Sequence, residues 1–226
     1  MIGLKKLRYF SIAIKKQLVM PKVEVEHRGR LTENKFRELK SFLQRKGRFV
    51  GVKNRFSVIY SPSGGKETFN LHRSPIDLKV RITNKKAELV LKYGQWSGND
   101  ARKEFLFPIE AKKFGEMIEF LQILGFYYGV LQATTTYVYL YKGIEFALVR
   151  VPRWGYYFEA EIDTTPVKVK KANEKIKIVC DELGISVVSD REFCQLLTSL
   201  NNRPGYQFNF RKQKFADIKK RFNAYF

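Results

Sequence analysis

Two segments of the chain each carry two glutamates one residue apart, and these pairs are the residues best suited to chemistry. The first segment is Glu24-Val25-Glu26, and the second is Glu159-Ala160-Glu161. In a β-strand, residues i and i+2 point to the same face, so each pair aims two carboxylates in one direction. Gathering four carboxylates is costly unless cations neutralise them. Together the pairs indicate a metal-dependent site acting on a polyanion, whereas either pair alone is better explained as the solvated face of an amphipathic strand.

Basic residues on the segments between the two pairs form a second set, in which paired members again lie at i, i+2 spacing. This basic set is Arg28, Lys79, Arg81, Lys92 and Arg102, and Glu104 extends the acidic set. Carboxylate oxygens and water suit Mg²⁺ or Mn²⁺, and arginine can engage phosphate oxygens bidentately. A metal ion that bridges a terminal phosphate would polarise phosphorus and help activate a water for in-line attack.

Strands must position these side chains, and the hydrophobic pattern provides them. The predicted strands cover residues 22–30, 48–60, 76–83, 87–93, 101–108, 126–141, 144–151 and 156–162. Helices are predicted after an N-cap at Thr32, over 110–124, from Pro166 to Leu183, and after a cap at Asp190. Many antiparallel strands with few helices predict an α+β fold whose sheet closes on itself, because closure removes exposed edges.

Positive charge is concentrated at the two ends of the chain. The formal net charge is +21, of which residues 23–200 carry +9. We therefore expect a basic extension over 1–22, a β-tunnel domain over 23–200, and a basic aromatic extension over 201–226. Such a charge implies anionic partners. In the last extension, Phe215, Ile218, Phe222 and Phe226 recur at helical spacing, which favours a helix docked on the sheet over an arm for nucleic acid or membrane.

The two cysteines and the apolar segments indicate where in the cell the protein is located. Cys180 and Cys194 are isolated and have no metal-binding spacing, which predicts reduced thiols in a cytoplasmic protein. No stretch is long enough to span a bilayer, and Lys15 and Lys16 interrupt the only apolar run near the start. Met20, just before the first strand, is a hypothetical alternative translation start.

At this point the sequence resembles a known family. Glu24-x-Glu26-x-Arg28 is similar to the Glu-x-Glu-x-Lys signature of the CYTH superfamily, the triphosphate tunnel metalloenzymes. Further segments resemble later motifs of that superfamily in the same order. These segments are Leu78–Arg81, Leu89–Lys92, Arg102–Glu104, Leu148–Glu161 and Arg191–Leu197. A lone signature of this kind is weak, but several in the right order are strong evidence for the fold.

The resemblance implies a fold and a set of roles. The superfamily has an antiparallel eight-stranded tunnel and includes inorganic, thiamine and RNA triphosphatases as well as class IV adenylyl cyclases. Carried over, the carboxylates of Glu24, Glu26, Glu159 and Glu161 would bind Mg²⁺ or Mn²⁺ and serve catalysis, with Glu104 supporting them. The basic residues Arg28, Lys79, Arg81, Lys92 and Arg102 would hold the triphosphate. The resemblance thus predicts a hydrolase that removes a terminal phosphate.

The chain departs from the superfamily pattern at several positions. Arg28 replaces a lysine, Gln132 and Thr134 stand where the superfamily has Lys-x-Arg, Val149 stands where it has aspartate, and Leu106 where it has glutamate. Losing a desolvated charge-assisted phosphate contact costs about 2–3 kcal/mol, so catalysis is expected to be weakened by orders of magnitude. Because both glutamate pairs remain, triphosphatase activity is still the favoured interpretation.

Two alternatives stay open from the sequence. One is cyclisation of ATP by a class IV-type adenylyl cyclase. The other is a binding protein in which the tunnel holds polyphosphate or an RNA 5′ end while the basic flanks contact the nucleic-acid backbone.

Overall fold

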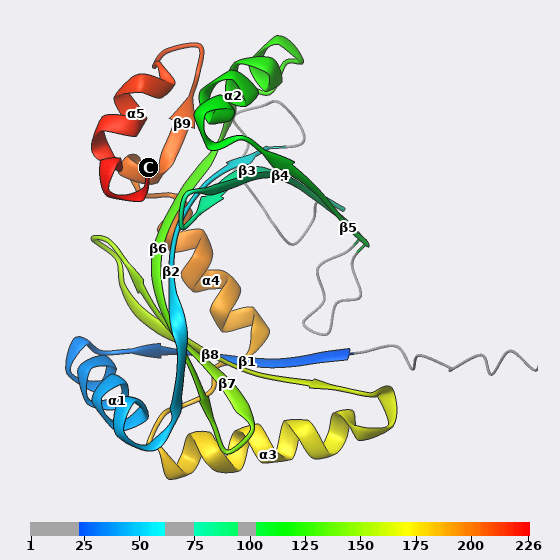
Figure 1. Cartoon of the computed structure of the whole chain (residues 1–226), viewed down its shortest axis with the longest axis vertical. Coiled ribbons are helices and arrows are strands. Elements are labelled where there is room, and N and C mark those ends of the chain that lie inside the picture. The colour runs from blue at the N-terminus through cyan, green and yellow to red at the C-terminus, as the bar shows by residue number, and fades with distance from the viewer. Residues whose placement is uncertain (1–22, 62–74, 95–102) are drawn as a thin grey trace, which may run out of the picture.

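The computed structural model describes residues 23–61, 75–94 and 103–226 (Figure 1). The strands are β1 Val23–Leu31, β2 Arg48–Tyr60, β3 Ile76–Thr83, β4 Lys86–Tyr93, β5 Lys103–Ile109, β6 Tyr128–Tyr141, β7 Ile144–Val151, β8 Gly155–Thr164 and β9 Gln207–Asn209. The helices are α1 Glu33–Lys46, α2 Phe114–Ile123, α3 Val169–Glu182, α4 Asp190–Asn201 and α5 Phe215–Arg221. None of these helices is long and apolar enough to cross a membrane.

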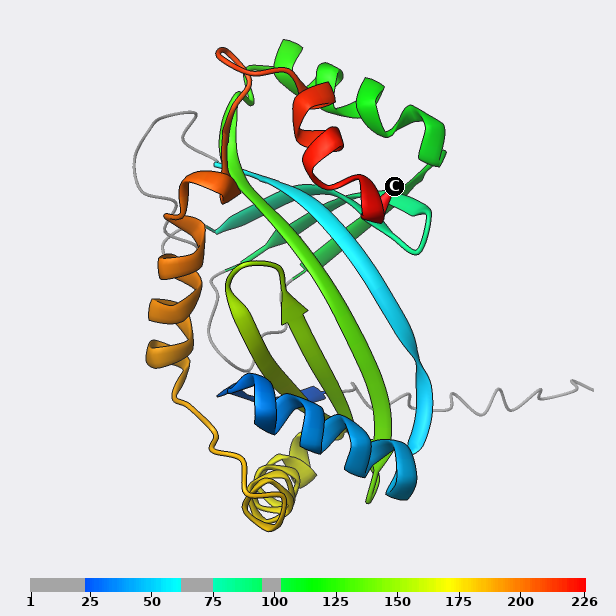
Figure 2. The same ribbon diagram turned by 90° about the vertical axis from the view of Figure 1, so that its left-hand side faces the viewer.

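Eight strands form one antiparallel sheet in the order β1-β8-β7-β6-β2-β3-β4-β5, and the short β9 pairs with β6. The long strands β2 and β6 join a half made of β1, β8 and β7 to a half made of β3, β4 and β5 (Figures 1 and 2). The sheet curls, so the two halves face each other across a concave side. The predicted α+β antiparallel fold is confirmed as a curled half-barrel. In the described part of the chain, β1 and β5 are its two edges.

Local sequence explains most element boundaries. Thr32 caps α1, accepting a hydrogen bond from the Lys35 backbone at 3.2 Å, as predicted. The β3–β4 hairpin turns at Asn84 and Lys85, both with positive φ. The predicted cap of α4 was wrong by one residue. Ser189 is the cap, because its hydroxyl accepts from the Glu192 backbone while the Glu192 side chain bonds back to Ser189, forming a capping box.

Apolar side chains of the convex side belong to two clusters, one of which also takes in Val149 and Tyr157 of the concave side. Helices α1 and α3 pack on the β1–β8–β7 half around Val25, Phe146 and Phe158. Helices α2 and α5 pack on the other half around Phe56 and Val80. Because side chains alternate along a strand, burying these residues turns their polar neighbours toward the concave side.

Residues of the C-terminal extension belong to this packing. Ile218 of α5 is fully buried, and Phe222 lies 5.0 Å from Phe56 between ring centroids. The docked helix favoured from the spacing of the aromatic residues is confirmed. The sequence did not predict β9, which adds three residues to the edge of β6. The basic extension over 1–22, with Met20, lies outside the described residues.

Candidate active site

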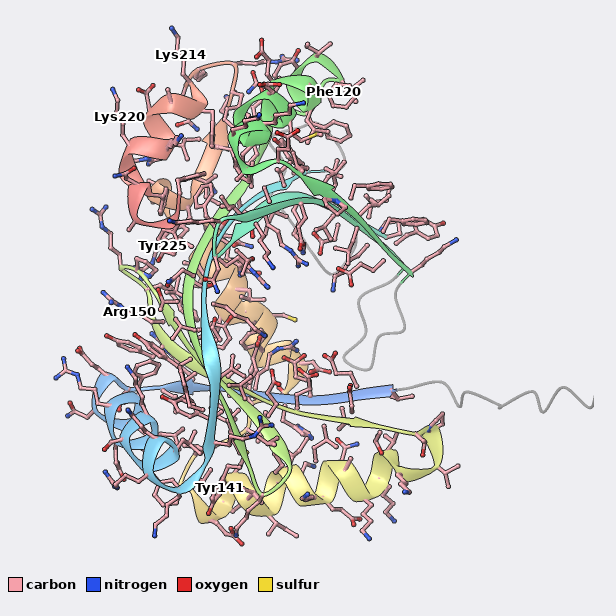
Figure 3. All side chains as sticks on the ribbon, viewed as in Figure 1. Phe120, Tyr141, Arg150, Lys214, Lys220 and Tyr225 are labelled. Atoms are coloured by element: carbon pink, nitrogen blue, oxygen red, sulfur yellow. The ribbon has the colours of Figure 1, made fainter. Side chains whose placement is uncertain are left out.

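The strand register brings the two glutamate pairs to the same surface. In the antiparallel pairing of β1 with β8, Glu24 lies opposite Asp163, Glu26 opposite Glu161, and Arg28 opposite Glu159. Directly opposed residues project from the same face of a sheet. Two adjacent strands therefore present five carboxylates and the guanidinium groups of Arg28 and Arg30 to the concave side, where nitrogen- and oxygen-tipped side chains gather (Figure 3).

Three of these carboxylates form one group at the end of the two strands. Glu24, Glu161 and Asp163 each offer an oxygen, and these atoms lie within 4.8 Å of one another. The pKa of Glu161 is raised to about 7, by burial first and then by the nearby charges of Glu24, Glu145 and Asp163. Such a cluster of oxygen donors fits a divalent cation, which would relieve the repulsion among the carboxylates.

Asp163 was not among the predicted ligands. It continues the alternation of Glu159 and Glu161 by one further step along β8, and that i, i+2 spacing is the signal that could have found it.

Glu26 and Glu159 are held differently, because Arg28 lies between them. The Arg28 guanidinium is ion-paired with Glu26, and its Nε donates to Glu159 Oε1 at 3.4 Å. Burial and the charge of Glu159 raise the pKa of Glu26 to about 8, against the opposing effect of Arg28. Burial opposes a charged Arg28, yet Glu26 and Glu159 raise its pKa. The four predicted glutamates thus divide into two groups: Glu24 and Glu161 with Asp163, and Glu26 and Glu159 with Arg28.

The predicted phosphate-binding residues of β3 and β4 lie on the other half of the sheet, and each has an acidic partner. Lys79 Nζ lies 2.8 Å from Asp77, and Arg81 Nε donates to Glu88 at 2.7 Å. The register pairs Arg81 with Glu88 and Asp77 with Lys92, so these residues share one face. Burial lowers the pKa of Lys79, and Asp77 opposes the shift.

Glu104 lies far from the other predicted metal ligands in the strand order. It sits on β5 opposite Lys92 of β4, and the Lys92 Nζ lies 3.6 Å from its carboxylate. The structure does not bring Glu104 together with Glu24 and Glu161, and its proposed support of the metal stays a prediction. Arg102 lies outside the described residues.

Arg55 of β2 is a concave-side cation that the sequence analysis missed. The register places it opposite Thr83 of β3 and Thr134 of β6, and its Nε donates to Thr83 Oγ1 at 3.0 Å. Its pKa is lowered by burial first and then by Arg81, whereas Glu159 and Glu88 oppose the shift. The alternation of Lys53, Arg55 and Ser57 along a strand was the available signal.

The departures from the superfamily pattern can now be placed. Thr134 is buried opposite Arg55, and Gln132 lies opposite Ser57, which is also buried. Val149 is 2% exposed and packs in the cluster that contains Tyr157 and Phe193. An aspartate at Val149 would therefore sit among apolar groups rather than in an open polar site.

Helix α4 bounds the acidic half of the site. The Phe193 ring lies 5.6 Å from the Tyr157 ring, and the Arg28 guanidinium lies 5.2 Å from the centroid of Phe193. Phe193 thus contacts the residue that bridges Glu26 and Glu159. By contrast, His27 points to the other face of β1, where its ring bonds to Asn173 at 2.8 Å.

Comparison with known proteins supports the fold. No family model and no curated protein matches the chain. A protein of Pyrococcus horikoshii OT3 matches with a TM-score of 0.60 and 21% identity over 78% of this chain and 99% of that one. A candidate adenylate cyclase of Vibrio parahaemolyticus matches with a TM-score of 0.54 and 16% identity over 78% and 98%. A candidate adenylyl cyclase of Hippeastrum, described as having a dominant triphosphatase activity, matches with 0.52 and 15% over 81% and 98%.

The fold is CYTH-like. The matched proteins are covered almost entirely, so the shared region is the whole curled sheet rather than one motif. The resemblance seen in Glu24-x-Glu26-x-Arg28 is confirmed at the level of the fold. Within the CYTH-like fold, function depends on the side chains of the concave surface.

Proposed function

We propose that the chain is a metal-dependent phosphohydrolase that removes the terminal phosphate of a triphosphate on the concave side of the sheet. The observation that carries this proposal is the convergence of Glu24, Glu161 and Asp163 on a surface that also presents Lys79 and Arg81. Carboxylates for a cation and cations for phosphate are the two halves of a phosphoryl-transfer site.

The acidic group fits Mg²⁺ or Mn²⁺ by its chemistry. Glu24, Glu161 and Asp163 offer only carboxylate oxygens, which these ions prefer, and the open concave side leaves room for water ligands. The bound ion would supply a Lewis acid for a phosphate oxygen. Arg28 holds Glu26 and Glu159 in fixed positions beside this group, so these two carboxylates can orient a water or a second cation.

In the basic half, on β3 and β4, the cations would bind substrate phosphates in place of the carboxylates with which they are now paired. Lys79, Arg81 and Lys92 are each paired with a carboxylate. A triphosphate must compete with those carboxylates, and its higher total charge and larger number of phosphate oxygens favour it over a monophosphate. We therefore propose inorganic, nucleoside or thiamine triphosphate as the substrate class, with polyphosphate as a related ligand.

The test is phosphate release from tripolyphosphate, nucleoside triphosphates and thiamine triphosphate with Mg²⁺ or Mn²⁺. We expect activity in the wild-type protein and its loss in Glu24→Ala and Glu161→Ala. Glu182→Ala is the matched control, because Glu182 pairs with Lys142 away from the site. No release from any of these substrates, or unchanged turnover in Glu161→Ala, would contradict the proposal.

The adenylyl cyclase alternative uses the same site, and it gains support from the fold shared with the Vibrio protein. Incubation with labelled ATP separates the two reactions. Release of inorganic phosphate supports the hydrolase, whereas release of pyrophosphate with cyclic AMP supports the cyclase.

The basic ends of the chain support a second candidate function, which is binding of RNA. In the C-terminal extension, the basic side chains point to solvent while Ile218 is buried, as Lys214 and Lys220 illustrate in Figure 3. Binding of 5′-triphosphorylated RNA that weakens steeply with salt would support it. We also propose a cytoplasmic location, because Cys180 is a free, buried thiol.

A further inference from the structure

The centre of the concave surface combines uncharged β6 residues with a neighbouring cation. Gln132 and Thr134 of β6 lie directly opposite Ser57 and Arg55 of β2. Opposed residues in an antiparallel pair are separated by about 5 Å between Cβ atoms. A long side chain on β2 therefore reaches the space in front of the neighbouring β6 residues.

Arg55 differs in its partners from the four predicted phosphate-binding cations that the structure describes. Arg28, Lys79, Arg81 and Lys92 each have a carboxylate within ion-pair distance. Within residues 23–61, 75–94 and 103–226, Arg55 has none, and its one hydrogen bond goes from Nε to the neutral Thr83 hydroxyl. A half-buried guanidinium with no carboxylate within ion-pair distance is costly to keep in the free protein, and an anionic ligand in direct contact reduces that cost.

The charges around Arg55 place it between the two halves of the site. Arg81 on β3 repels it, whereas Glu159 on β8 and Glu88 on β4 attract it from either side. It therefore lies within electrostatic range of both the carboxylates beside the proposed metal site and the phosphate-binding row of β3. A phosphate chain that extends from one half to the other passes this position.

We propose that Arg55 binds a phosphate group of the substrate at the centre of the concave surface and supplies the positive charge that Gln132 and Thr134 lack. The proposal rests on the proposed function only in requiring a triphosphate on this surface. The planar fork of Arg55 can bind two phosphate oxygens at once, which selects a phosphate chain over a single carboxylate.

Binding of tripolyphosphate in EDTA, measured by calorimetry, tests Arg55 without requiring turnover. We expect Arg55→Gln to weaken binding by about 10- to 100-fold, because a charge-assisted contact is lost. Arg55→Lys should recover part of the affinity, since it keeps the charge and loses the fork. Arg150→Gln is the matched control, because Arg150 is an exposed β7 residue on the convex side (Figure 3).

Two further measurements separate binding from a structural role. The thermal midpoint of Arg55→Gln in EDTA should not fall below that of the wild type, because the substitution removes a charge that burial and the neighbouring Arg81 disfavour. With metal present, KM should rise much more than kcat falls.

Each outcome decides between the proposals. If Arg55→Gln binds tripolyphosphate within about twofold of wild type, the role of Arg55 is overturned and the phosphohydrolase proposal is untouched. If wild type binds with the expected dependence on Arg55 but releases no phosphate, the hydrolase proposal falls and the role of Arg55 stands. If wild type does not bind tripolyphosphate at all, the role of Arg55 is overturned.

Discussion

Arg28 divides the carboxylates of the concave surface into two groups with different chemistry. Glu24, Glu161 and Asp163 repel one another and favour a bound cation, whereas Glu26 and Glu159 already share the positive charge of Arg28. The arginine at this position thus acts partly as an internal counter-ion. Its planar guanidinium can contact both carboxylates at once, which the point charge of a lysine does less well.

Replacing Arg28 by glutamine should expose the second carboxylate pair. We expect the free energy of unfolding in EDTA to fall by about 1–3 kcal/mol, because two close carboxylates lose their shared cation. Mg²⁺ should restore more stability to this variant than to wild type, since the freed carboxylates can bind a cation. Urea denaturation with and without Mg²⁺ measures both effects.

The matched control for this prediction is Arg37→Gln. Arg37 forms an exposed ion pair with Glu33 on α1, which is worth little, so the change should stay within about 0.5 kcal/mol. An Arg28→Gln variant as stable as wild type in EDTA would contradict the bridging role.

For single residues, the sequence predicted which side chains of one strand share a face. It did not predict which residues of neighbouring strands lie beside them. The i, i+2 rule predicted that Glu24 and Glu26 share one face of their strand, and that Lys79 and Arg81 share one face of theirs. Alternation along β2 marks Arg55 as a candidate, but its position between Thr83 and Thr134 follows only from the placement of β2 between β3 and β6. The division of the glutamates depends on the pairing of Arg28 with Glu159, whose positions are 131 residues apart.

The elements around the sheet hold the site from outside, and α4 illustrates how. Its capping box at Ser189 fixes the start of a helix whose Phe193 contacts Arg28. The cap was one residue away from its predicted position, because Ser189, Asp190 and Glu192 all suit a helix N-terminus and only the backbone geometry selects among them.

Removing this cap should loosen α4 and the contact with Arg28. Ser189→Ala should destabilise the protein by about 1 kcal/mol, because the Glu192 backbone N–H loses its acceptor. Hydrogen exchange should accelerate in α4. Thr32→Ala removes the cap of α1 and serves as the control, in which exchange in α4 should be unchanged. Equal exchange in α4 for both variants would contradict a local role for Ser189.

Helix α5 tests whether residues 201–226 are part of the folded core. Ile218→Ala should cost about 2–4 kcal/mol, because a fully buried side chain leaves a cavity against the sheet. Lys219→Ala, at an exposed neighbouring position, should stay within about 0.5 kcal/mol. Chemical denaturation of both variants gives the comparison, and equal stabilities would indicate an arm that does not contribute to the fold.

The sequence predicted the docking of this helix better than it predicted the strand before it. The spacing of Phe215, Ile218 and Phe222 alone predicts an apolar helix face. A strand of three residues has too little alternation to be recognised, and β9 pairs with the part of β6 that extends beyond β7.

Across the whole molecule, charge is distributed unevenly over one curled sheet. Carboxylates outnumber cations on the concave face of β1 and β8, whereas on β3 and β4 the cations Lys79, Arg81 and Lys92 are each paired with a carboxylate, within a chain of net charge +21. The convex face is apolar and covered by helices. The curl of the sheet places the charged residues of β1 and β8 opposite those of β3 and β4. Without a ligand, this arrangement stores unfavourable electrostatic energy, and the fold must supply stability elsewhere to hold it.

That stored energy predicts an unusual pH dependence for the metal-free protein. The pKa of Glu161 is raised from 4.5 to about 7, so between these values the folded state keeps a proton that the unfolded state has lost. The unfolded state then binds fewer protons, and the free energy of unfolding falls as the pH rises from about 5 to 8. In EDTA, thermal midpoints should therefore decrease over this range, and Glu161→Gln should reduce the decrease.

Mg²⁺ should reverse this trend, because deprotonated carboxylates bind the cation and link its affinity to stability. The gain in midpoint on adding Mg²⁺ should grow with pH in wild type and should be small in Glu161→Gln. Glu182→Gln, which changes an exposed residue of α3, should follow wild type in both conditions. A wild-type midpoint in EDTA that rises from pH 5 to 8, with no added effect of Mg²⁺, would show that the carboxylates of β1 and β8 do not act as one repulsive group.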